Sequence, residues 1–253
     1  VADDWRPQIH DSDGLQMHTG AGEWIWRPLT NPSVVRVNSY LDDNPRGFGL
    51  MQRDHRFSDY QDDGAWYNRR PSCWVAPKGA WNKGAVMLVE IPTETETMDN
   101  MVAFWNPAEE IVPGRAYDYG YRLYWCAENP FNPDRALVRA TRDGIGGVVG
   151  RKRTKFSWRF VVDFVGGDIP MLTKDDPVVA VISTSHGHVE IVSARPLVPI
   201  KGWRAMFDLV PDGAPGPIDL RLYLALHGQA LSETWMYQYT PPPLAVQRTY
   251  LSS

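Results

Sequence analysis

The feature of this sequence that most constrains its fold is an alternation of side chains with a period of two residues. In the stretch AYDYGYRLYWC every second position is large and apolar: Tyr117, Tyr119, Tyr121, Leu123 and Trp125. Successive side chains of a β-strand point to opposite faces, so this spacing predicts a strand with one apolar face. The same period recurs in Lys155–Phe164, Gly202–Val210 and Pro217–Leu226. The alternation predicts an all-β fold.

Strands are also predicted in the first half of the chain, where long polar and aromatic segments separate them. They are Val34–Tyr40, Phe48–Gln52, Gly84–Ile91 and Met101–Asn106. The only helix we predict is short, within Arg53–Asp63, because Gly64 ends it. Long loops on a β scaffold are places where binding sites are built.

A domain boundary is predicted at the Pro/Asn stretch NPFNPDR, which begins at Asn129. We predict a first domain over residues 1–133, a glycine-rich and basic linker or flap over 134–153, and a β-sandwich over 154–253. Six strand-like runs support the sandwich, near residues 155–165, 178–184, 189–198, 203–210, 218–227 and 234–239, and their spacing suggests an immunoglobulin-like architecture. The tail from Thr240 is predicted to be extended.

Several classes of partner are disfavoured by composition. The chain has 26 basic and 30 acidic residues, a net charge of −4, so we expect no nucleic-acid partner. No apolar run approaches the roughly 20 residues that span a bilayer, so we expect no membrane insertion. No nucleotide or zinc motif occurs, and His186 and His188 lack a third ligand nearby, so we expect no cofactor and no metal. For Cys73 and Cys126, two buried thiols are favoured over a disulfide.

Aromatic residues are abundant, with 11 Trp, 11 Tyr and 8 Phe making 12% of the chain. Aromatic rings exposed in a cleft stack on sugars, so a carbohydrate ligand is one hypothesis. Trp24 and Trp26 share one face of a predicted strand, and core packing and a sugar platform explain the pair equally. The run from Asp42 to Trp74 mixes cations, carboxylates and phenols, and fits either a ligand-binding loop or an ion-paired one.

Two acidic segments are candidates for chemistry. Residues 90–100, EIPTETETMDN, carry four carboxylates and no cation, which is typical of a solvated loop but also of one half of a catalytic pair. Residues 10–14, HDSDG, fit either a turn or a carboxylate that faces a cleft, and they fail the calcium-loop pattern.

Several long strings resemble the periplasmic osmoregulated glucan biosynthesis proteins of the MdoG/OpgG and OpgD type. They are RPQIHDSDGL, GEWIWRPL, DDNPRGFGLMQRD, YQDDGAWYNRRPS, KGAWNKGAVMLVEIPTETETMDNMVAFW, GWRAMFDLVPDG and DLRLYLALHGQALSETWMYQY. The resemblance implies a periplasmic protein with a large galactose-mutarotase-like β-sandwich followed by a smaller immunoglobulin-like one. Family members are longer, so the chain is expected to be the C-terminal half, with the N-terminal half of the same protein as a partner. We also expect a homodimer.

The resemblance to OpgD-type members implies an inverting endo-β-1,2-glucanase acting on β-1,2-glucan. Transglycosylation to cyclic glucans, or glucan binding without catalysis, are the alternatives. By motif, Asp99 matches the general acid, and Asp11 matches the base, which in this family is thought to reach the attacking water through a relay of waters. Glu96, Tyr67 and Ser12 match supporting positions. Residues expected to bind substrate or support the site are Trp24, Trp26, Arg53, Arg69 and Trp105.

Two further expectations concern the environment of these residues. A general acid must stay protonated, and we expect burial against Phe104 or Trp105, together with repulsion from Glu96, to raise the pKa of Asp99. The glycine-rich and basic stretch GIGGVVGRKR, residues 144–153, is either a flap that closes over a cleft or an interdomain linker.

Overall fold

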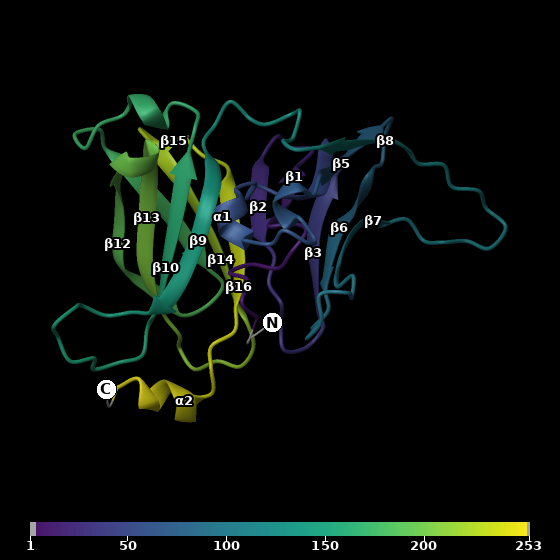
Figure 1. The fold of residues 1–253 in the computed structure, drawn as a ribbon. Helices are drawn as coiled ribbons and strands as arrows, with labels where there is room; N and C mark the ends of the chain where they lie inside the picture. The colour runs from purple at the N-terminus through teal and green to yellow at the C-terminus, as the bar shows by residue number, and fades with distance from the viewer. Residues whose placement is uncertain (1–3, 252–253) are drawn as a thin grey trace. The chain divides into compact units, whose positions relative to one another are not determined.

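The computed structural model describes residues 4–251 and is built almost entirely of β-strands (Figure 1), which confirms the predicted all-β class. The described chain divides into two compact units, residues 4–132 and 133–251. Between residues 4 and 251, no helix is both long and apolar enough to cross a membrane.

Unit 1 contains two antiparallel sheets. The larger has the strand order β2-β1-β4-β5-β8, with bounds Gly14–His18 (β1), Trp24–Pro28 (β2), Gly47–Met51 (β4), Ser72–Lys78 (β5) and Gly120–Cys126 (β8). The smaller has the order β3-β6-β7, with bounds Arg36–Asp43, Lys83–Glu90 and Met101–Pro107. Two short helices, α1 (Phe57–Tyr60) and the 3₁₀ helix η1 (Tyr67–Arg69), lie between β4 and β5 in sequence.

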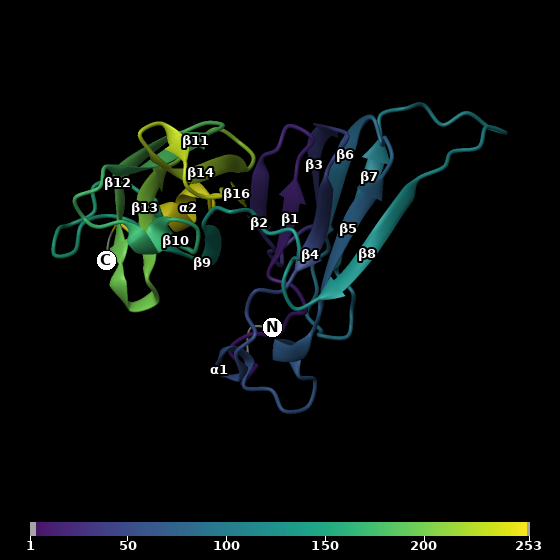
Figure 2. The same cartoon turned by 90° about the horizontal axis from the view of Figure 1, so that it is seen from above.

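The core of unit 1 lies between these two sheets (Figure 2). Trp81 is buried there, with its ring 6.4 Å from Phe48 of β4 and 5.9 Å from Trp105 of β7. A buried ion pair also joins the sheets, because Nη2 of Arg27 on β2 lies 2.8 Å from Oε2 of Glu90 on β6. These contacts fix the ends of β2 and β6 against each other, where two of the acidic and polar loops begin.

Unit 1 also exposes apolar side chains on its sheets. On the smaller sheet Val37, Leu41, Val102 and Phe104 are 59%, 86%, 43% and 43% exposed. Strand alternation places all four on the face turned away from the larger sheet. Exposed apolar patches of this kind are typical of interaction surfaces.

Unit 2 is a sandwich of two antiparallel sheets. One has the order β11-β14-β16, with β15 beside β14, and the other has the order β12-β13-β10-β9. The bounds are Leu137–Ile145 (β9), Trp158–Val165 (β10), Val178–Thr184 (β11), His188–Leu197 (β12), Gly202–Val210 (β13), Ile218–Leu226 (β14), Gln229–Ala230 (β15) and Thr234–Tyr239 (β16). Its core is aromatic: Phe160 of β10 lies 5.4 Å from Phe207 of β13 and 5.8 Å from Trp235 of β16. The immunoglobulin-like and galactose-mutarotase-like names remain predictions.

The segment predicted as a linker or flap, residues 134–153, is different in the structure. Most of its first part is β9, which pairs with β10 from Ile145 to Leu137. Residues 146–157 form the connection, and Asp208 anchors it by accepting the Gly147 N–H at 2.7 Å. The prediction missed β9 because charged residues and glycine interrupt its apolar alternation.

The C-terminal tail also differs from the predicted extended form, since Leu244–Thr249 form the short helix α2 after the prolines. Two further 3₁₀ turns are η2 (Ile169–Met171) and η3 (Val198–Ile200).

Both cysteines are free thiols, as predicted, but each is only partly buried instead of fully buried. Cys73 of β5 pairs with Trp125 of β8, while Cys126 pairs with Ser72. Directly paired residues share a face of a sheet and successive residues alternate, so the two thiols point to opposite faces. The strand register therefore opposes a disulfide, although the residues lie on neighbouring strands. Partial burial raises the pKa of both thiols.

Candidate functional site

A pocket of about 600 Å³ lies within unit 1. It collects side chains from five parts of the chain: the segment before β1, the segment after β2, strand β4, helix η1 and the β6–β7 loop. The lining includes Asp11, Ser12, Asp13, Asn31, Leu50, Tyr67, Thr93, Glu96, Met98 and Asp99. Five residues predicted for the site from the sequence are thus brought together: Asp11, Ser12, Tyr67, Glu96 and Asp99.

The loop that carries Glu96 and Asp99 is a hairpin connection closed at its base. The Ile91 N–H donates to the Asn100 carbonyl at 2.8 Å, and the Asn100 side-chain amide donates back to the Ile91 carbonyl at 2.9 Å. Asn31 holds the same loop from the end of β2. Its side chain donates to the Thr93 carbonyl at 2.7 Å and accepts the Thr93 N–H at 3.0 Å. The two acids therefore project from a loop with a fixed base.

The segment that carries Asp11 and Ser12 is held through the next residue, Asp13. The Asp13 N–H donates to the Met51 carbonyl at 2.8 Å, and its carbonyl accepts the Leu29 N–H at 2.9 Å. The Asp13 carboxylate accepts the backbone N–H groups of Arg53 and, at 2.7 Å, of Asp54. Asp13 thus joins the ends of β1, β2 and β4, and it fixes where the preceding two residues enter the pocket.

Tyr67 and Glu96 contact each other inside the pocket. The Tyr67 hydroxyl donates to Oε2 of Glu96 at 3.4 Å, and the same oxygen lies 2.5 Å from Nη2 of Arg6. Arg70 lies above the Tyr67 ring at 5.3 Å and 3.6 Å from Oδ1 of Asp11. Burial and the nearby carboxylates raise the pKa of Tyr67, so its hydroxyl stays a hydrogen-bond donor.

Asp13 is a largely buried carboxyl of the pocket, with 15% of its side chain exposed. Burial raises its pKa and Asp54 adds to this effect, while His10 and the two backbone N–H groups oppose it. A raised pKa means that the folded protein retains a proton that the unfolded chain, with a carboxyl pKa near ~3.9, releases. The contribution to stability is therefore complete below that pH, and is lost as the pH rises through the folded pKa.

We expect Asp13→Asn to remove this pH dependence, because its amide oxygen still accepts the two N–H bonds but exchanges no proton. The free energy of unfolding of the wild type, relative to the variant, should fall as the pH rises from 4 to 7. The slope is at most ~1.4 kcal/mol per pH unit, the value for one proton. Urea titrations across this range measure it, and parallel pH curves for the two proteins would contradict the role of Asp13.

Asp99 does not have the environment that the sequence predicted. It is exposed, as are Glu96 and Phe104, so neither Phe104 nor Trp105 buries it. The reason is local: the loop leaves the sheet after Ile91 and returns at Asn100, and its acidic residues turn to solvent. Asp99 is nevertheless one of the residues that line the pocket.

Five other predicted site residues lie outside the pocket lining. Trp24 and Trp26 are buried, so core packing is the interpretation that the structure supports: Trp24 stacks on Trp74 at 5.8 Å, and Trp26 covers Gly14, where a Cβ would lie 2.4 Å from the ring. The guanidinium of Arg53 lies 3.5 Å over the Trp26 ring. The remaining two stack elsewhere, Arg69 over Trp66 at 3.9 Å and Trp105 beside Trp81.

Three residues that organise the pocket were missed as site residues: Arg6, Asn31 and Asp13. Asp13 had a sequence signal, since it directly precedes the glycine that begins β1. Arg6 and Asn31 had none, because their partners Glu96 and Thr93 are far along the chain. Among residues 4–251, no group of three His, Cys, Asp or Glu side chains is placed to hold a metal ion.

The pocket can therefore bind a neutral, hydroxyl-rich ligand. It presents carboxylates as acceptors, the Tyr67 hydroxyl as a donor and the Asn31 and Ser12 side chains as further polar groups. Its acids come from two separate segments, Asp11 before β1 and Asp99 in the β6–β7 loop. Two carboxyl groups delivered from different elements are the minimum for acid–base cleavage of a glycosidic bond.

The chain matches known proteins along almost its whole length. Residues 1–239 match the family model described as "Periplasmic glucan biosynthesis protein, MdoG". "Probable glucans biosynthesis protein D" of Shewanella oneidensis is 62% identical over 242 residues, which are 95% of this chain and 45% of that protein. "Glucans biosynthesis protein D" of Stenotrophomonas maltophilia is 60% identical over 251 residues, 98% of this chain and 47% of that protein.

A third relative, "Glucans biosynthesis protein D" of Xanthomonas axonopodis pv. citri, is 58% identical over 250 residues, 98% of this chain and 47% of that protein. The chain thus spans about half the length of these relatives. The matches confirm the family and the periplasmic location predicted from the sequence strings. The chain belongs to the MdoG family of periplasmic glucan biosynthesis proteins.

Proposed function

We propose that the protein is an inverting endo-β-1,2-glucanase that takes part in periplasmic glucan biosynthesis. The observation that carries this proposal is the pocket itself, in which the fold brings Asp11 and Asp99 together from positions far apart in the sequence. Relatives that are about 60% identical bear the name glucans biosynthesis protein D, which supports a glucan as the ligand.

In this proposal Asp99 is the general acid, and it protonates the glycosidic oxygen as the bond to the leaving sugar breaks. Asp11 is the base, and it accepts the proton from the water that attacks the opposite face of the sugar, through a relay of waters. Tyr67 and Ser12 line the same pocket and offer hydroxyl groups to that relay. Glu96 orients the Tyr67 hydroxyl.

The exposure of Asp99 and Asp11 favours a second candidate, a glucan-binding protein without hydrolytic activity. An acid open to water lacks the burial that keeps a general acid protonated. Under the first proposal, Asp99 must be buried by another part of the full-length protein. The exposed apolar face that carries Leu41 and Phe104 supports such a contact between unit 1 and further chain. The homodimer remains a prediction.

Incubation of the full-length protein with linear β-1,2-glucan tests these candidates. A hydrolase generates shorter chains with one new reducing end for each cleavage, and the anomeric configuration read by proton NMR is inverted. A transglycosylase gives cyclic or rearranged glucans with no new reducing ends. Unchanged chain length, with binding seen by calorimetry, supports the second candidate and rejects the first.

A further inference from the structure

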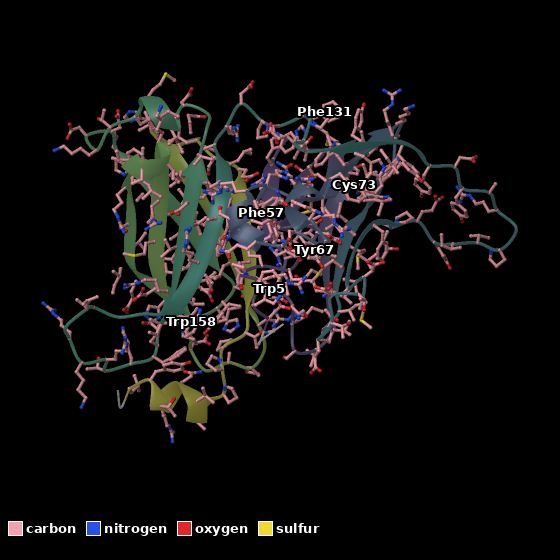
Figure 3. The ribbon with its side chains drawn as sticks, viewed as in Figure 1. Trp5, Phe57, Tyr67, Cys73, Phe131 and Trp158 are labelled. Atoms are coloured by element: carbon pink, nitrogen blue, oxygen red, sulfur yellow. The ribbon has the colours of Figure 1, made fainter. Side chains whose placement is uncertain are left out.

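Arg6 lies close to the pocket without lining it, and it contacts Glu96, one of the carboxylates that do. It lies in the segment before β1, one residue after the exposed Trp5 labelled in Figure 3. Only 13% of its side chain is exposed. A guanidinium at such a position keeps its charge and presents several N–H groups in a fixed plane.

The Arg6 guanidinium contacts three carboxylates. Its Nε and Nη2 donate to the two oxygens of Asp4, each at 2.9 Å. Its Nη1 donates to Oδ2 of Asp62 at 2.6 Å, and its Nη2 lies 2.5 Å from Oε2 of Glu96. Three acids from three segments thus share a single positive charge, so the position of each depends on Arg6.

Two of these acids control the Tyr67–Glu96 contact. Asp62 forms the turn that leads into η1, where its Oδ1 accepts the N–H groups of Gly64 and Ala65, each at 2.7 Å. Arg6 and these bonds lower the pKa of Asp62 to about 2, so Asp62 is ionised at neutral pH. Tyr67 is the first residue of η1. Arg6 therefore fixes both the turn that positions Tyr67 and the carboxylate that accepts its hydroxyl hydrogen.

We propose that Arg6 is a positioning residue for the glucan reaction. It holds the Glu96 carboxylate and the Tyr67 hydroxyl in contact with each other within the pocket. This inference rests on the proposed function for its kinetic consequence, but its structural consequence can be measured separately. Without Arg6, the carboxylates of Asp4, Asp62 and Glu96 face one another with no cation between them, and like charges at such distances repel. Glu96 is the one that moves, because its loop is exposed while Asp62 is buried.

The kinetic test compares Arg6→Gln with Arg6→Lys and with Arg56→Gln in the full-length protein. We expect Arg6→Gln to lower kcat about 10²-fold while KM changes less than about threefold, as for a misplaced catalytic group. Arg6→Lys should have a kcat about tenfold higher than that of Arg6→Gln, because its ammonium keeps the charge although it lacks the planar guanidinium. Arg56 is 71% exposed and pairs with Asp59 at 3.0 Å, away from the pocket lining, so Arg56→Gln should change kcat less than twofold.

A double-mutant cycle with Glu96→Gln separates positioning from a merely structural role. If Arg6 acts through Glu96, the double variant should have a kcat less than about threefold below that of Glu96→Gln alone. Independent, multiplicative losses in kcat overturn the proposal. Equal losses for Arg6→Gln and Arg6→Lys also overturn it, since charge would then be irrelevant.

A crystal structure of Arg6→Gln distinguishes the failure of this inference from the failure of the proposed function. A displaced Glu96 carboxylate that no longer contacts Tyr67 supports positioning, even if the wild type proves unable to cleave β-1,2-glucan. An unmoved Glu96 overturns the inference, whatever the activity of the wild type. If Arg6→Gln does not fold, the same comparison is made with Arg6→Lys, in which the loss of the planar guanidinium should loosen the contact with Glu96.

Discussion

Asp99→Asn is expected to lower kcat for cleavage of β-1,2-glucan by about 10³-fold while glucan binding changes less than about threefold. Asparagine keeps the size and polarity of the side chain but has no proton to give to the glycosidic oxygen, and a positioned general acid contributes roughly 10²- to 10⁴-fold. Reducing-end assays on the full-length protein measure kcat, and calorimetry measures binding.

Glu94→Gln is the matched control for Asp99→Asn. Glu94 lies on the same loop and is also exposed, but it does not line the pocket, so its variant should retain full activity. An aryl β-glucoside substrate sharpens the test, because a phenolate leaving group needs little protonation and should recover most of the lost rate. Near-normal turnover of glucan by Asp99→Asn, or equal losses on both substrates, would exclude Asp99 as the acid.

Glu90→Gln is expected to lower the free energy of unfolding by about 3–5 kcal/mol, the usual cost of leaving one partner of a buried ion pair without the other. Arg27 and Glu90 have side chains 1% and 0% exposed, and their charged atoms lie 2.8 Å apart. Glu90 also accepts the backbone N–H of Thr30 at 2.8 Å and its hydroxyl at 3.1 Å. Thr30 precedes Asn31, so activity should fall together with stability.

Urea denaturation followed by tryptophan fluorescence measures this loss, and Glu109→Gln is its control. Glu109 pairs with Arg115 at 2.5 Å, but both side chains are about half exposed. Its replacement should cost less than about 0.5–1 kcal/mol. Replacing Arg27 and Glu90 together by Met and Leu should restore much of the loss, because no charge then stays buried alone. A Glu90→Gln variant as stable as the wild type would show that solvent reaches the pair.

Much of the fold could be predicted from the sequence, because most strands follow the period-two alternation. The predicted runs near 178–184 and 234–239 coincide with β11 and β16, and Gly202–Val210 with β13. The prediction failed where alternation is masked. β1 begins directly after a turn, and β5 contains a proline. β9 carries the charged Arg142, which pairs with Asp163 on the neighbouring strand β10 rather than marking a loop.

For the site, motif resemblance predicted which residues gather, whereas physical patterns alone did not. Asp11, Ser12, Tyr67, Glu96 and Asp99 line one pocket. The tryptophan pair on β2 shows the limit of residue-type reasoning, since a same-face pair looks alike in a core and on a sugar platform. Exposure depends on what packs over a segment, and that information is spread over the whole chain.

The closed base of the β6–β7 hairpin separates most of the pocket loop from the paired strands. Pairing of β6 with β7 is complete from Gly84 and Pro107 to Glu90 and Met101, and the Ile91–Asn100 bonds seal it. Thr93, Thr95, Glu96, Met98 and Asp99 reach the pocket from beyond these closing bonds, whereas Asn100 and Met101 line it from the closed base itself. A substitution in this loop can therefore change the lining of the pocket while the pairing of β6 with β7 stays intact.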